Sequence, residues 1–104
     1  MMSEQEERKF IEDERYDFIE KYYGRRVHIK VIDDKVSDFD GKVGWFDEYD
    51  EAEEGEDMQG IIFDDVDMIG RKSRDGLSIP LSWIGSYIPL ERENTPEEIA
   101  ALNF

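Results

Sequence analysis

The sequence predicts a single α+β domain in which an N-terminal helix packs on a five-stranded small β-barrel and a short helix ends the chain. Three observations favour this fold class. Apolar residues recur at helical spacing in residues 1–24, short alternating or apolar runs fill residues 25–90, and a helix-start motif lies in residues 91–104. A chain of 104 residues is the size of one domain, and 12% aromatic residues can build a small core.

The first element is a helix predicted over residues 4–23. Ser3 and Glu6 have the spacing of a capping box, in which each side chain bonds a free amide of the first turn. Gly24 is a typical C-terminal stop. One face carries residues that recur at helical spacing, namely Ile11, Arg15, Phe18, Ile19 and Tyr22. The aromatic residues beside this face are Phe10, Tyr16 and Tyr23. Either Tyr16 and Tyr23 cover the end of the barrel, or these aromatic residues contact a partner helix or a second copy of the chain.

Five short strands are predicted at residues 27–32, 42–49, 59–64, 77–81 and 87–90. In the first, Val27 and Ile29 alternate with polar residues, as in a half-buried strand. Gly44 indicates a bulge or a close approach in the second strand, and Pro80 indicates an edge or a kink in the fourth. Turns are predicted at residues 39–41 and 71–76, and a single helical turn at residues 82–84.

The last element is a short helix that begins after Thr95 and runs through Leu102. Thr95 is an N-cap residue, Pro96 takes the first helical position, and an acid follows at the capping-box position. The helix is expected either to fray or to dock through its apolar residues Ile99, Leu102 and Phe104.

The strand order resembles the Src-homology-3-like small barrel, which has five short strands and a one-turn helix between the fourth and fifth. The segments that carry the resemblance are Gly-Lys-Val-Gly at 41–44, Gly-Ile-Ile-Phe at 60–63, and residues 77–84 and 87–90. The resemblance implies the fold alone, because such barrels bind proteins, RNA, DNA or other subunits. Peptide-binding members use aromatic clusters, and Tyr49, Trp83 and Tyr87 could form one, but the characteristic motifs of those members are missing.

Several classes of function are disfavoured by what the sequence lacks. It has no cysteine, so disulfides and thiolate chemistry are excluded. The only histidine, His28, lies in a predicted strand without partners for a triad or a metal site, and no nucleotide-binding or zinc-protease motif is present. The acidic run fails the EF-hand pattern, because the twelfth position counted from Asp50 is Ile61. We therefore expect no enzymatic activity, no cofactor and no metal site.

The sequence also predicts where the protein is located and which partners it does not bind. The N-terminus is too acidic for a signal or transit peptide, and no apolar run approaches membrane-spanning length. A net charge of −15 repels nucleic acid and anionic membranes. We expect a cytoplasmic protein that binds neither directly.

The acidic run is the strongest functional signal. Residues 43–70 contain eleven acids and no Lys or Arg, which is most of the net charge of −15. A field of one sign attracts partners of the opposite sign, so the sequence predicts a binding protein for a basic partner surface, such as a nucleic-acid-binding protein or a nuclease. DNA mimicry is the most specific form of this hypothesis. The predicted partner-binding residues are Asp47, Glu48, Asp50, Glu51, Glu53, Glu54, Glu56 and Asp57, followed by Asp64, Asp65 and Asp67.

Small acidic phage or mobile-element inhibitors, of the anti-restriction or anti-CRISPR type, are similar in size, charge and lack of cysteine. Two alternatives stay open. In the first, residues 47–57 are a solvated hairpin tip on a structural, adaptor or oligomerisation module. Otherwise the barrel contacts nucleic acid through its short basic clusters, which are Arg25, Arg26, Lys30, Arg71, Lys72 and Arg74.

Overall fold

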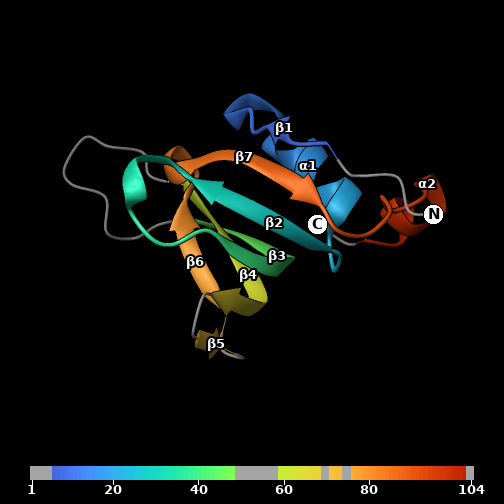
Figure 1. Ribbon diagram of the computed structural model, residues 1–104. Helices are drawn as coiled ribbons and strands as arrows, with labels where there is room; N and C mark the ends of the chain where they lie inside the picture. The colour runs from blue at the N-terminus through green and yellow to red at the C-terminus, as the bar shows by residue number, and fades with distance from the viewer. Residues whose placement is uncertain (1–5, 49–58, 69–70, 74–75, 103–104) are drawn as a thin grey trace.

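A computed structural model of the chain describes residues 6–48, 59–68, 71–73 and 76–102. Over these residues the protein is an α+β domain with a seven-stranded antiparallel sheet and two short α-helices (Figure 1). The elements in chain order are β1 (Arg8–Lys9), η1 (Glu12–Glu14), α1 (Arg15–Tyr22), β2 (Arg26–Val31), η2 (Ile32–Asp34), β3 (Phe39–Glu48), β4 (Gln59–Met68), β5 (Arg71–Ser73), β6 (Leu77–Pro80), η3 (Leu81–Trp83), β7 (Ile84–Pro89) and α2 (Pro96–Ala101). The predicted α+β class and the short C-terminal helix are confirmed.

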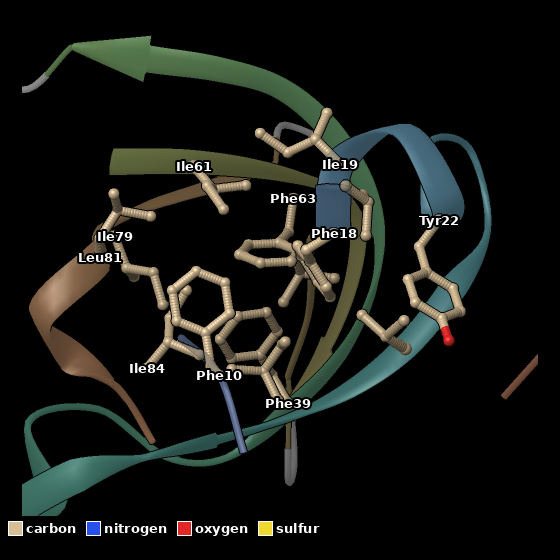
Figure 2. Packing of buried hydrophobic residues seen from close by; sticks show 14 residues of the cluster. Phe10, Phe18, Ile19, Tyr22, Phe39, Ile61, Phe63, Ile79, Leu81 and Ile84 are labelled. Carbon is tan, nitrogen blue, oxygen red and sulfur yellow. The ribbon is translucent and has the colours of Figure 1, made fainter. Parts of the chain in front are cut away.

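The sheet has the strand order β1-β7-β2-β3-β4-β5, and β6 also pairs with β4. Only the three residues of η3 separate β6 from β7, although these strands pair with β4 and β2 respectively. The sheet must therefore curl, and its strands curve round a common core (Figure 2). Within the described residues no strand pairing joins β6 to β7. The sheet is open, so the predicted closed barrel of five strands is not confirmed.

The predicted helix over residues 4–23 is wrong in its first half. The helix α1 begins only at Arg15, and the preceding described residues form β1, which pairs with β7, and the single turn η1. Phe10 explains the difference, because it is buried and packs edge-on against Phe18 with ring centroids 5.4 Å apart. Burying a phenylalanine stabilises the fold by about 1.5–3 kcal/mol, which outweighs local helix propensity. Ser3, the predicted N-cap, lies outside the described residues.

The end of α1 agrees with the sequence. Gly24 follows the helix with a φ of 74°, the left-handed conformation that a glycine stop supplies. The predicted helical face is only partly correct. Phe18, Ile19 and Tyr22 are buried, whereas Ile11 precedes the helix and is 46% exposed.

The strands largely follow the predicted runs, and Val27 and Ile29 of β2 are buried as expected. The predicted turn at residues 39–41 is wrong, because these residues begin β3. Phe39 is buried against Phe63 with ring centroids 5.2 Å apart, and Gly41 lets the two strands approach, since a Cβ there would lie 3.2 Å from Phe63 Cβ. Part of the predicted turn at 71–76 is instead β5. The last strand begins three residues before the predicted start.

One core fills the curled sheet. Side chains of α1, β2–β4, β6, η3 and β7, together with Phe10, point toward one another in Figure 2, and Tyr22 turns its hydroxyl oxygen away from the cluster. The buried residues are Phe10, Phe18, Ile19, Tyr22, Val27, Ile29, Phe39, Val43, Ile61, Phe63, Val66, Ile79, Leu81 and Ile84.

The Tyr22 hydroxyl connects the two ends of the described chain. It accepts a hydrogen bond from Arg8 Nη1 of β1 and donates to Glu93 Oε1 at 3.1 Å, and Arg8 also pairs with Glu93 at 3.2 Å. Burial raises the pKa of Tyr22 well above its usual range, so the phenol keeps its proton.

Candidate functional site

The predicted acids fall into three groups in the structure. Six of them lie outside the described residues: Asp50, Glu51, Glu53, Glu54, Glu56 and Asp57. Asp47 and Glu48 are the last two residues of β3, where the backbone is described. Asp64, Asp65 and Asp67 lie on β4. Asp64, Asp65 and Asp67 therefore share one strand. The acidic segment 47–57 begins at the end of β3, and the chain returns to the sheet at the start of β4.

That segment begins and ends at one end of a long hairpin. The strands β3 and β4 have ten residues each, and their pairing runs from Phe39↔Met68 to Glu48↔Gln59. The chain thus leaves β3 and returns to β4 at directly opposed positions. Gly44 lies midway along this hairpin, where the register shifts between Val43 and Phe46, as the sequence predicted for a bulge or close approach.

A second bulge arranges the acids on β4. Asp65 has a φ of 49°, and the register shifts from Asp40↔Asp67 to Lys42↔Asp64 around it. Arg26 on β2 contacts the acids at this bulge. Its Nη1 donates to Asp65 Oδ2 at 3.1 Å and to the Asp65 carbonyl at 3.2 Å, and its Nη2 lies 3.9 Å from Asp67 Oδ2. Two of the predicted partner-binding acids are therefore compensated within the domain.

Asp64 has a different environment. Its side chain is exposed and lies over two glycines of neighbouring strands and turns. A Cβ on Gly44 would come within 3.1 Å of Asp64 Oδ2, and one on Gly76 within 3.4 Å of Oδ1. The absence of side chains at these positions makes room for the carboxylate. Lys42 is its cross-strand neighbour.

The predicted basic clusters contribute counter-charges. Arg25 donates to Asn94 Oδ1 at 2.8 Å and to Glu98 Oε2 at 2.6 Å, and Lys30 Nζ lies 2.6 Å from Glu7 Oε1. Arg26 pairs with the acids of β4. The backbone of Arg71 and Lys72 forms part of β5, and Arg74 lies outside the described residues. The contacts of the first-strand cluster weigh against a basic nucleic-acid surface there.

His28 is a half-buried strand residue, as predicted. Its Nδ1 lies 2.6 Å from Asp40 Oδ1 on the neighbouring strand β3. In the part of the chain that the structure describes, no group of three or more His, Cys, Asp or Glu side chains is arranged to hold a metal ion. A hollow beside Phe10 and Phe18 has about 30 Å³, which is room for a water molecule and too small for an organic substrate.

A polar network that sequence reasoning missed joins the C-terminal segment to α1. Asn94 is 9% exposed, and its Nδ2 donates to the carbonyls of Glu20 at 3.0 Å and Tyr23 at 3.1 Å. Glu98 completes the capping box of α2 with Thr95 and also contacts Arg92 at 2.7 Å. The Arg92 guanidinium, together with the Thr95 backbone amide, lowers the pKa of Glu98 to about 2. The sequence could predict the contact of Thr95 with Glu98 because the two residues are three positions apart. It could not predict the contacts of Asn94, whose partners are about 70 positions away.

Trp45, an exposed aromatic residue, is not in the predicted cluster of Tyr49, Trp83 and Tyr87. Trp83 and Tyr87 are partly buried and pack against the core, and Tyr49 lies outside the described residues. Trp45 on β3 is instead 56% exposed and contacts the Tyr23 ring, with centroids 5.5 Å apart. Its position two residues after buried Val43, just past the Gly44 bulge, carries no clear sequence signal, because the bulge disturbs strand alternation.

The chain was compared with protein-family models, curated proteins and solved structures, and none of them matches. Among the helices of the described residues, none has the length and apolar character needed to cross a membrane. The case for a function therefore depends on the chemistry of the surface itself.

Proposed function

We propose that this chain is a non-enzymatic acidic binding protein that occupies a basic surface of a partner protein. The observation that carries the proposal is the uneven distribution of charge between the described sheet and residues 47–57 of the sequence. On the described sheet, Arg26 engages Asp65 and Asp67. Residues 47–57, by contrast, hold eight acids and no Lys or Arg, and they begin where the β3–β4 hairpin ends. Such a concentration of one sign of charge attracts a basic partner.

DNA mimicry is the specific form of this proposal, with a nucleic-acid-binding protein or a nuclease as the partner. Duplex DNA carries one negative charge per ~1.7 Å of axis, and alternate side chains of a strand are ~6.6 Å apart on one face. The acids of 47–57 would imitate phosphates, as in an anti-restriction or anti-CRISPR inhibitor. Among the acids of β4 we assign Asp64 to this surface, because Asp65 and Asp67 already face Arg26.

We also infer that the sheet is a variant of the Src-homology-3-like barrel. The strands β2, β3, β4, β6 and β7 keep the predicted order, with the one-turn helix η3 between the last two. The return of β7 to pair with β2 supports this relationship, since neighbouring first and last strands are what barrel closure requires.

A structural or oligomerisation module is the alternative, in which the acidic segment only keeps the chain soluble. Ile11 and Tyr16 favour it, because both are large and exposed, Tyr16 on α1 and Ile11 just before η1, where a second copy could bind. This alternative predicts an association that salt does not weaken and that substitutions at Tyr16 or Trp83 do weaken. The proposed acidic interface predicts the reverse, because salt screens exposed charges over ~8–10 Å.

Charge reversal tests the proposal. The tagged chain is used to capture partners from bacterial lysate, which are then eluted along a salt gradient and identified by mass spectrometry. We expect a basic DNA- or RNA-handling protein that salt releases and added DNA displaces. The combined change Glu51→Lys, Glu53→Lys and Glu54→Lys should abolish its capture.

The matched control reverses three exposed acids elsewhere, in η1, by the change Glu12→Lys, Asp13→Lys and Glu14→Lys. Net charge changes equally in the two variants, so only position distinguishes them. If the variant at positions 51, 53 and 54 captures the partner as well as the unaltered chain does, residues 47–57 are not the interface.

A further inference from the structure

Trp45 is unusually exposed for its type. Tryptophan is highly buried on average, yet 56% of this residue is accessible. It lies on β3, and its ring meets the Tyr23 ring at an interplanar angle of 72° with the centroids 5.5 Å apart. This edge-to-face packing fixes the indole without covering it.

The Tyr23 backbone is itself held at several points. Its N–H donates to the Ile19 carbonyl at 2.8 Å, its carbonyl accepts from Asn94 Nδ2 at 3.1 Å, and it forms a β-bridge with Val43. Trp45 therefore packs on a residue that the end of α1, the C-terminal segment and β3 all hold in place. A rigid aromatic surface loses little conformational entropy when it binds a partner.

The position of Trp45 relates it to the acidic segment. Asp47 and Glu48 follow it by two and three residues on the same extended strand. At a rise of ~3.3 Å per residue, their backbones are about 7 and 10 Å from it along β3. A segment with eight acids and no Lys or Arg thus begins two residues after an exposed indole, which attracts a cation through its ring quadrupole.

We propose that Trp45 is the aromatic anchor of the partner-binding surface and takes an arginine side chain of the basic partner. This inference rests on the proposed function for the sign of the partner's charge. Arginine fits better than lysine, because its planar guanidinium stacks on an aromatic ring while its N–H groups remain available to nearby carboxylates. Tryptophan is also among the residues enriched in interface hot spots.

A fluorescently labelled arginine nonapeptide tests the inference. Its affinity for the full chain is measured by anisotropy at low salt, with a lysine nonapeptide of equal charge in parallel. We expect the arginine peptide to bind more tightly, and Trp45→Ala to weaken its binding about tenfold, with Trp45→Phe between the two. Tyr16→Ala is the matched control, because Tyr16 is also 56% exposed, and it should change the affinity less than twofold.

The fluorescence of Trp45 reports peptide binding directly, without a substitution at that residue. In a Trp83→Phe background the emission comes from Trp45 alone, and saturation with the arginine peptide should quench or shift it. Unchanged emission at saturation, or equal affinity of the Trp45→Ala chain, would overturn the anchor. If binding in that case still weakens on reversal of Glu51, Glu53 and Glu54, the proposed function survives. If neither peptide binds the unaltered chain, both proposals are wrong.

Discussion

Asn94 shows how a single residue attaches the C-terminal segment to the domain. Its amide and backbone N–H groups together satisfy three carbonyls at the end of α1, those of Glu20, Lys21 and Tyr23. Its Oδ1 accepts from Arg25 Nε at 2.8 Å. The last carbonyls of a helix have no partner within the helix, so a buried side chain that supplies donors there replaces water.

Asn94→Ala should therefore destabilise the protein by about 2–3 kcal/mol, because it leaves the part-buried carbonyls of Glu20 and Tyr23 and the Arg25 Nε–H without their partner. Urea unfolding followed by circular dichroism measures the loss. Glu97→Ala, at an exposed position of α2, should stay within about 0.5 kcal/mol of the unaltered protein. A loss at Asn94 no larger than that of this control would mean that water replaces its hydrogen bonds.

Residues differed in how far the sequence could predict their roles. The capping box of Thr95 and Glu98 was visible because its partners are three positions apart. Asn94 and Trp45 were not, since their contacts come from residues distant in the sequence. The compensation of Asp65 and Asp67 by Arg26 depends likewise on a strand pairing that spacing alone does not reveal.

At the scale of elements, substitutions at two glycines of the sheet should differ in their cost to stability. A Cβ on Gly44 or on Gly85 would approach another atom to 2.9 Å, but the atoms differ. At Gly44 the obstacle is the Ile62 carbonyl oxygen of the paired strand, which cannot move without breaking the hairpin. At Gly85 it is the Cγ2 methyl of Ile32, a side chain that is partly exposed and can rotate away.

We expect Gly44→Ala to cost about 1–3 kcal/mol, as overpacking does. Gly85→Ala should cost less than about 1 kcal/mol, because the lower backbone entropy of the unfolded alanine chain offsets part of the strain. Urea midpoints of the two variants make the comparison. Equal losses would show that the Ile62 carbonyl adjusts as readily as a methyl group, and that the β3–β4 hairpin is less rigid than its pairing indicates.

Burial of particular side chains explains which elements the sequence predicted correctly. The alternation of Val27 and Ile29 identified β2 because one face is buried and the other is polar. The first half of the predicted N-terminal helix failed because Phe10 lies off the helical stripe and reaches the core from an extended segment. Residues 39–41 read as a turn because Asp-Gly favours turns locally, whereas burial of Phe39 extends β3 through them.

For the whole molecule, the excess of acid is the dominant physical property. The chain has 28 acids and 13 basic residues. In the described part, six basic residues form ion pairs with acids: Arg8, Lys21, Arg25, Arg26, Lys30 and Arg92. Much of the positive charge is therefore used to connect strands and ends of the chain, and the acids of 47–57 are left as the largest block without nearby basic residues in the sequence.

This imbalance predicts opposite effects of salt on folding and on binding. A net charge of −15 destabilises the compact state by self-repulsion, so moderate NaCl should raise the melting temperature of the free chain. Each 1 kcal/mol recovered by screening would raise it by ~4–8 °C. The same salt should weaken capture of a basic partner. Calorimetry at several NaCl concentrations compares the free chain with the combined Glu51→Gln, Glu53→Gln and Glu54→Gln variant. If repulsion between acids is the cause, the melting temperature of the variant should rise less with NaCl, because three charges are removed. A melting temperature that falls with NaCl would mean that ion pairs, not repulsion between acids, control stability.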